Sequence, residues 1–202
     1  MNRHPLLIIF AKAPRLGTVK TRLARHVGNG AALNMYRRML AETLSAAGQV
    51  PARLDVRLVV TPDRFASRGN FWPRGIETGA QGIGDLGQRM GRQFLSAGRD
   101  RHVVLVGSDI PQMTGPMLQS AFGHLAGGQD GVFGPSEDGG FWLVGFRAGR
   151  YTPRMFRNIR WSHSETYRDV RSALPSHYRI AEVETLNDID DLSDYQRYIS
   201  TR

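Results

Sequence analysis

The chain has 202 residues, of which 41% are hydrophobic and 22% are charged, so it can bury a core without disulfides or a structural metal. It contains no cysteine, which excludes a disulfide framework, a cysteine nucleophile and thiolate metal sites. The net charge of +9 comes from basic residues scattered along the chain without a basic run or tail, a pattern that argues against nucleic-acid binding and suits an anionic small substrate.

Short apolar runs alternate with amphipathic stretches along the chain. Strands are expected at Leu6–Phe10, Leu54–Val60, His102–Val106, Gly131–Phe133, Phe141–Phe146 and Tyr178–Val183. Helices are expected at Gly17–His26, Ala31–Ala47, Leu86–Ala97, Met117–Leu125, Ser164–Leu174 and Ile189–Tyr198. This alternation predicts an α/β fold, a three-layer α/β/α sandwich with a mostly parallel sheet, formed by a single domain over residues 1–202. The two strands around residues 134–140 leave little room for a helix between them, so the sheet is expected to be mixed.

The first apolar run, residues 5–11, is much shorter than the roughly 18 residues that span a membrane. No small-residue cleavage site follows it soon after, so we expect neither a signal peptide nor a membrane span. The expected location is therefore the cytoplasm.

A basic loop follows the first strand. Four cations lie within the eleven residues from Lys12 to Arg22, and Gly17 stands near the expected start of a helix. Helix N-termini offer free N–H groups and a positive dipole end to phosphates. Lys12 and Lys20 are the only lysines in the chain, which favours a role for a compact ammonium group. The loop is therefore a candidate phosphate site, although it lacks a Walker A pattern; the alternative is a solvated basic loop.

Acidic residues mark two further places. Asp109 closes the third strand, where the following Pro111 restrains the backbone, and a carboxylate in that position suits a divalent metal. Asp188 and Asp190 lie in an acidic stretch near the C-terminus, and either can complete a metal site with Asp109. The alternatives are a turn or capping aspartate at position 109, and an acidic first turn of the last helix.

Two glycine-rich segments also carry candidate residues. Glu137 and Asp138 lie between two apolar strands, where they can bind hydroxyl groups or a metal, or simply form a hairpin turn. Gly84 and Asp85 belong to a G-x-G-x-x-G match that no buried strand precedes, which argues against a dinucleotide fold. A glycine-rich entry to a helix can still contact a nucleotide.

Taken in order, these motifs resemble the bacterial DUF2064 family, whose members are glycosyltransferase-like proteins of the GT-A, nucleotide-diphospho-sugar transferase superfamily. The matching segments follow one another in order along nearly the whole chain: residues 10–14, 17–23, 81–90, 107–111, 134–143, 160–162 and 188–190. The resemblance implies the fold of that superfamily. It is much less specific for a reaction, because the superfamily includes both glycosyltransferases and nucleotidyltransferases.

The resemblance also implies roles for particular residues. The first loop of such enzymes holds the nucleotide phosphates, a role that would fall on Lys12, Gly17, Lys20 and Arg22. The aspartate after the middle strand binds Mg²⁺ or Mn²⁺, which would be Asp109, with Asp188 or Asp190 as a further ligand. The sequence departs from the glycosyltransferase D-x-D motif, because Ser108-Asp109-Ile110 contains one acid, and this resembles the nucleotidyltransferase arrangement.

We therefore expect a metal-dependent transferase that binds a nucleotide or nucleotide-sugar donor, with an acceptor that the sequence does not identify. In a sugar transfer, Asp109 would hold the metal and Glu137 or Asp138 would orient or deprotonate the acceptor. One alternative is a guanylyltransferase-like nucleotidyltransferase that releases pyrophosphate. A second is a non-catalytic nucleotide- or partner-binding protein on the same fold.

Overall fold

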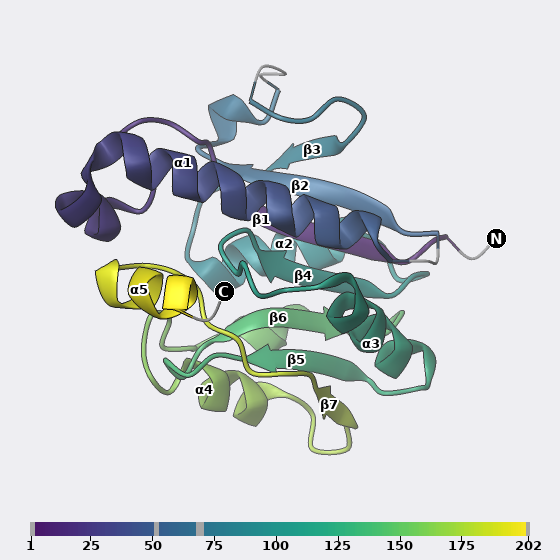
Figure 1. The fold of residues 1–202 in the computed structure, drawn as a ribbon. Coiled ribbons are helices and arrows are strands. Elements are labelled where there is room, and N and C mark those ends of the chain that lie inside the picture. Colours follow the sequence, from purple (N-terminus) through teal and green to yellow (C-terminus); the bar gives the residue numbers. More distant parts are fainter. Residues whose placement is uncertain (1–2, 51–52, 68–70, 201–202) are drawn as a thin grey trace.

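The computed structural model describes residues 3–50, 53–67 and 71–200 (Figure 1). Within these residues seven strands form one sheet in the order β3-β2-β1-β4-β6-β5-β7. All neighbouring strands are parallel except the two pairs that β6 forms with β4 and β5, so the expected mixed, mostly parallel sheet is confirmed. The strands are β1 (Leu6–Lys12), β2 (Asp55–Thr61), β3 (Glu77–Ala80), β4 (Val103–Gly107), β5 (Gly131–Pro135), β6 (Phe141–Phe146) and β7 (Ile180–Glu182).

Helices cover both faces of this sheet. Figure 1 shows α1, α3 and α5 in front of the strands and α2 behind them. The bounds are α1 (Thr21–Gly48), α2 (Leu86–Ser96), α3 (Gly115–Ala126), α4 (Thr166–Ala173) and α5 (Leu192–Ser200), with short 3-10 turns at Asp63–Phe65 and Pro153–Phe156. Because successive side chains of a strand point to opposite faces, Leu7 and Ile9 of β1 join the core under α1 and α3, whereas Leu6 and Ile8 join the core under α2 and α4. The expected three layers are confirmed.

The start of the first helix differs from the sequence prediction. A helix was expected from Gly17, but α1 begins at Thr21, and Lys20 before it has a left-handed backbone with φ of 46°. The helical run then continues to Gly48 across a break at Gly28, whose φ of 83° suits glycine. That break separates the two helices expected in this region.

One strand was not predicted, and the start of the last helix was predicted too early. No buried strand was expected before Gly82, and β3 is indeed without a buried residue, because it is the edge strand of the sheet. Lacking an apolar run, it gives no strand signal. The last helix begins at Leu192 rather than Ile189, because the Asp191 carboxylate accepts hydrogen bonds from the backbone N–H groups of Ser193 and Asp194 and so caps the helix there.

The C-terminal helix closes one end of the molecule. Val19, Tyr36 and Met39 from the first part of the chain pack with Ile189 and Tyr198 in a small separate core. This contact brings the segment before α5 to the carboxyl ends of β1 and β4. None of the helices that the structure describes is long and apolar enough to cross a membrane.

Candidate functional site

The carboxyl ends of β1 and β4, the start of α1 and the segment before α5 enclose a cavity of about 510 Å³. That volume lies in the range of roughly 300–1,000 Å³ typical of ligand sites, at the edge where open α/β sheets bind ligands. Four cationic side chains line it, and we call it the cationic cavity: Lys12, Lys20, Arg22 and Arg89. The basic loop predicted from sequence therefore faces a real cavity.

The Tyr36 hydroxyl holds the beginning of the basic loop in place. Its oxygen accepts a hydrogen bond from the Lys12 backbone N–H at 2.7 Å and donates to the Lys12 carbonyl oxygen at 2.9 Å. It also lies 3.1 Å from Ser108 Oγ, next to Asp109. Burial raises the pKa of Tyr36 to about 12, so the phenol stays protonated. One side chain of α1 thus connects the ends of β1 and β4.

Three carboxylates meet beside this cavity. Asp109, Asp188 and Asp190 each offer one oxygen, and these three oxygens all lie within 4.8 Å of one another. The Nζ atom of Lys20 lies 2.8 Å from an oxygen of Asp109 and 2.8 Å from an oxygen of Asp190. The structure therefore brings together residues that are 89 and 170 positions apart in the sequence. We call Asp109, Asp188 and Asp190 the acidic triad.

Electrostatics distinguish the members of this cluster. Burial lowers the pKa of the Lys20 ammonium, but Asp109 and Asp190 outweigh this effect and the pKa is raised above its ordinary value. Burial also opposes ionisation of Asp190, but the charge of Lys20 keeps the pKa of Asp190 below its ordinary value. Burial, together with the neighbouring charges of Asp190 and Asp109, raises the pKa of Asp188 to about 7. In the metal-free chain, one acid of the triad therefore retains a proton close to neutral pH.

The acidic triad fits a hard divalent cation. Carboxylate oxygens are the ligands that Mg²⁺ and Mn²⁺ prefer, and three of them converge here. The buried ammonium of Lys20, whose side chain is 5% exposed, already places positive charge against two of the three acids. A divalent cation bound here would share Asp109 and Asp190 with this ammonium, which offsets part of their negative charge.

A second cavity of about 240 Å³ adjoins the first one. The two cavities share Leu86, Gly107 and Asp109 in their walls. The residues that distinguish the second come from the β5–β6 turn, the start of β6 and the segment before α4. We call it the aromatic cavity, after three side chains in its wall: Phe141, Trp142 and Trp161. Asp138 and Asp188 also line this cavity.

Some predicted residues lie outside both cavities. Gly17, Gly84, Asp85 and Glu137 are not among the residues that line either one. Asp85 instead caps α2, where its carboxylate accepts the backbone N–H of Gln88 at 2.8 Å. The exposed Glu137 side chain lies 3.7 Å from Arg197 of α5.

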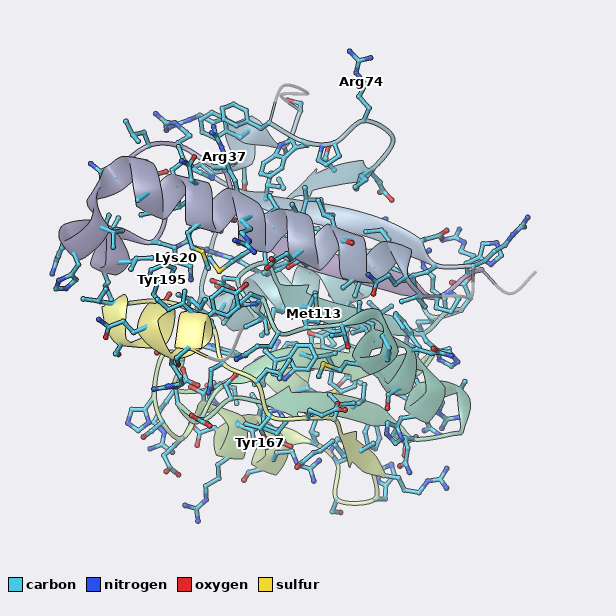
Figure 2. All side chains as sticks on the ribbon, viewed as in Figure 1. Lys20, Arg37, Arg74, Met113, Tyr167 and Tyr195 are labelled. Carbon is cyan, nitrogen blue, oxygen red and sulfur yellow. The ribbon has the colours of Figure 1, made fainter. Side chains whose placement is uncertain are left out.

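Sequence reasoning missed three residues of the cationic cavity as site candidates: Tyr36, Gln81 and Arg89. Tyr36 reads as one apolar position on an amphipathic helix. Gln81 is buried and donates from Nε2 to the carbonyl oxygens of Ala11 and Val59, both at 3.2 Å. Arg89 belongs to the matching segment 81–90, which pointed to this part of the chain as a nucleotide contact but did not single out Arg89. Figure 2 shows Lys20, the centre of the site, close to the start of α1.

Comparison with solved structures defines the class of fold. A provisionally named nucleotide-diphospho-sugar transferase from Desulfovibrio desulfuricans G20 is 30% identical, with 98% of this chain and 87% of that chain covered and a TM-score of 0.86. Rv0371c of Mycobacterium tuberculosis H37Rv in complex with manganese is 14% identical, with 99% and 100% covered and a TM-score of 0.62. The fold is that of the nucleotide-diphospho-sugar transferases.

The same fold extends to less similar structures. The 4-diphosphocytidyl-2C-methyl-D-erythritol synthase of Anaerococcus prevotii DSM 20548 is 11% identical, with 100% and 97% covered and a TM-score of 0.64. No curated protein matches the sequence. The family model DUF2064, described as an uncharacterised protein conserved in bacteria, matches residues 43–163, and the chain belongs to this family.

Proposed function

We propose that this protein is a metal-dependent transferase that binds a nucleotide-sugar donor in the cationic cavity. The observation that carries the proposal is the meeting of four cationic side chains with the acidic triad at the carboxyl edge of the sheet. A cavity with cations on one side and a metal-type carboxylate cluster on the other suits a diphosphate and its metal. The 30% identical transferase-like neighbour supports the same class.

The chain's own residues have distinct parts in this proposal. Arg22, whose side chain is 75% exposed, and Lys12 are the cations best placed to neutralise donor phosphates at the mouth of the cavity. Lys20 is held by two carboxylates, so it contributes a localised charge beside the metal site. Asp109, Asp188 and Asp190 would hold the Mg²⁺ or Mn²⁺, which supplies charge stabilisation for a departing phosphate group. Gly17, Gly84 and Asp85 would act through the loop conformations around the cavity.

Asp138 is the acid that we assign to the acceptor side. It lines the aromatic cavity, which shares Asp109 with the cationic cavity, so a group bound there lies next to the donor site. A carboxylate in this position can orient or deprotonate an acceptor hydroxyl. Glu137, the adjacent candidate, lines neither cavity and is the weaker candidate for this role.

A nucleotidyl transfer is the second candidate. It is favoured by the single acid of the Ser108-Asp109-Ile110 segment and by the fold shared with a 4-diphosphocytidyl-2C-methyl-D-erythritol synthase. The same cations and acids would then hold a nucleoside triphosphate, and pyrophosphate would leave in line. The leaving group distinguishes the candidates: a nucleoside diphosphate in sugar transfer and pyrophosphate in nucleotidyl transfer.

The experiment is a thermal-shift panel of nucleoside mono-, di- and triphosphates and nucleotide sugars, with and without Mg²⁺ or Mn²⁺. A ligand at 100 times its dissociation constant stabilises the fold by about 2.7 kcal/mol, a shift of about 5–10 °C for a chain of this size. A metal-dependent shift with one nucleotide supports the proposal and identifies the base. No shift with any nucleotide contradicts it.

Turnover is then measured with the ligand that binds, by assaying free nucleoside diphosphate and pyrophosphate. Asp109→Asn is expected to fold and to lose about 100-fold or more of the metal-dependent rate, the scale of a lost electrostatic contact in an active site. Asp100→Asn, in an exposed pair with Arg3, is the matched control. Full activity of Asp109→Asn would remove this residue from the metal site.

A further inference from the structure

The two adjoining cavities differ sharply in charge. Lys12, Lys20, Arg22 and Arg89 line the cationic cavity, whereas no lysine or arginine is among the described residues that line the aromatic cavity. The aromatic cavity is instead lined by three aspartates: Asp109, Asp138 and Asp188. Asp109 and Asp188 also belong to the acidic triad, so Asp138 is the one acid of this described wall outside the proposed metal site. A phosphate or carboxylate group bound there would have no cationic side chain of the wall to pair with.

The wall does offer neutral hydrogen-bonding groups. Ser136 and Ser162 line the aromatic cavity, and within the described part of the chain their hydroxyls have no hydrogen-bond partner. His163 accepts the backbone N–H of Glu165 at Nδ1, so its neutral ring carries the proton on Nε2 and can donate from there. Asp138 uses Oδ1 to accept the Gly140 N–H at 2.9 Å. Its second carboxylate oxygen can accept from a ligand.

Aromatic rings supply the rest of the wall. Trp161 and Phe141 are half-buried, with ring centroids 6.4 Å apart and planes at 69°. Trp161 is held from behind, because Gly87 of α2 leaves room for its ring: a Cβ at that position would lie 2.5 Å from the indole. Ring faces beside hydroxyl and carboxylate groups suit a ligand with apolar C–H surfaces and hydroxyl edges.

The volume limits the ligand further. About 240 Å³ is smaller than the roughly 300–1,000 Å³ of pockets for drug-sized ligands, so the aromatic cavity suits one small ring or a short polyol. The shared wall residue Asp109 places that group beside the acidic triad.

We propose that the aromatic cavity binds an uncharged, polyhydroxylated group, a sugar or polyol without phosphate, next to the donor phosphates. This deepens the proposed function and rests on it, because the cationic cavity is taken to hold the nucleotide. The same chemistry can come from the sugar of the donor or from a free acceptor. In either case a phosphorylated acceptor, as a nucleotidyl transfer to a sugar phosphate requires, would find no lysine or arginine in the described wall to pair with.

Binding of matched probes tests this directly. Glucose, glucose 6-phosphate, glycerol and glycerol 3-phosphate are titrated by calorimetry and ligand-observed NMR into the full chain, in the presence of Mg²⁺ and the best nucleotide. We expect a neutral member to bind at least about tenfold more tightly than its phosphate counterpart, the scale of one charge-assisted contact. Tighter binding of a phosphate, or no binding of any neutral member, overturns the proposal.

Variants of the wall then locate the binding. Asp138→Asn is expected to weaken binding of the neutral probe by about tenfold while leaving nucleotide affinity unchanged, and Asp100→Asn to change neither. Ser136→Lys adds the missing cation and is expected to improve binding of glucose 6-phosphate. Unchanged binding of the neutral probe in Asp138→Asn, or of the phosphate in Ser136→Lys, contradicts the assignment.

Two further readouts keep the proposals separate. Sugar binding without any nucleotide binding would contradict the proposed function alone, whereas nucleotide binding without sugar binding would contradict this inference alone. If the nucleotide sugar displaces the neutral probe, the aromatic cavity holds the donor's sugar. If both bind together, it holds the acceptor, and both outcomes support the proposed ligand class.

Discussion

Lys20 shows how one residue links backbone, charge and site. Its left-handed backbone costs roughly 1–2 kcal/mol for a residue other than glycine. The conformation directs Nζ to Asp109 and Asp190, both at 2.8 Å, and the buried ion pairs oppose that cost. Because these partners are distant in sequence, the local pattern around Gly17 predicts a helix start where the structure has a turn. The sequence predicts a phosphate-binding role for the cations of this loop. It does not predict that Lys20 pairs with Asp109 and Asp190.

A test at the same scale concerns the Tyr36 hydroxyl. Tyr36→Phe leaves the Lys12 N–H and carbonyl oxygen without their partner, so we expect a loss of about 1–3 kcal/mol in unfolding free energy. Thermal and urea unfolding measure this loss. Tyr195→Phe is the matched control, since the structure gives the Tyr195 hydroxyl no hydrogen bond in the described residues, and a change within about 0.5 kcal/mol is expected. Equal effects of the two variants would contradict the role of Tyr36.

At the scale of elements, Asp85 was a candidate nucleotide contact in the sequence, and in the structure it caps the N-terminus of α2. The Asp85 carboxylate accepts the Gln88 N–H at 2.8 Å, and the Gln88 side chain accepts the Asp85 N–H at 3.1 Å, which forms a capping box. Asp85→Ala is expected to cost about 0.5–2 kcal/mol of stability, whereas Asp85→Asn retains the cap. Urea unfolding and nucleotide titration of both variants are compared. Loss of nucleotide affinity in Asp85→Asn without loss of stability would make Asp85 a direct ligand.

Element prediction succeeded where burial is continuous. The core strands β1, β4 and β6 are apolar runs and were located within two residues at each end. β3 was not predicted, because an edge strand with no buried residue has no continuous apolar run. Within the β5–β6 turn, Glu137 and Asp138 are chemically alike in sequence, and only the folded turn shows that Asp138 faces the aromatic cavity. Which of two adjacent acids faces a cavity depends on contacts between segments far apart in the chain, and a single sequence does not show these contacts.

At the scale of the whole molecule, the described strands belong to one sheet, and α5 packs on α1. We propose that residues 1–202 form one domain, as the sequence led us to expect. Calorimetry should then show a single transition whose van't Hoff and calorimetric enthalpies agree. Two separable transitions would contradict this.

Acid stability follows from Asp130 at the end of the sheet opposite the acidic triad. Burial disfavours its charge, but the hydrogen bond from Arg147 at 2.7 Å and the nearby Arg150 outweigh burial and lower the pKa of Asp130 below its ordinary value. The folded state thus binds this proton less readily than the unfolded state. Its stabilisation is present above about pH 4 and is lost as pH falls through the lowered pKa.

Asp130→Asn therefore should lower the melting temperature at pH 7, and the gap to the unsubstituted protein should narrow as pH falls below about 4. Melting curves from pH 2 to 8 measure the gap, with Asp100→Asn as a surface control that changes stability by about 0.5 kcal/mol or less. A gap that stays constant with pH would contradict the charge-based account.

The central claim is that Asp109, Asp188 and Asp190 form a metal centre beside a nucleotide site. Electron paramagnetic resonance of Mn²⁺ titrated into the protein, with and without a nucleoside diphosphate, tests it most directly. We expect one bound Mn²⁺ per chain that binds more tightly with the nucleotide, and a loss of about 100-fold in affinity in Asp109→Asn. Equal Mn²⁺ affinity in Asp109→Asn and in the unsubstituted protein would contradict the claim.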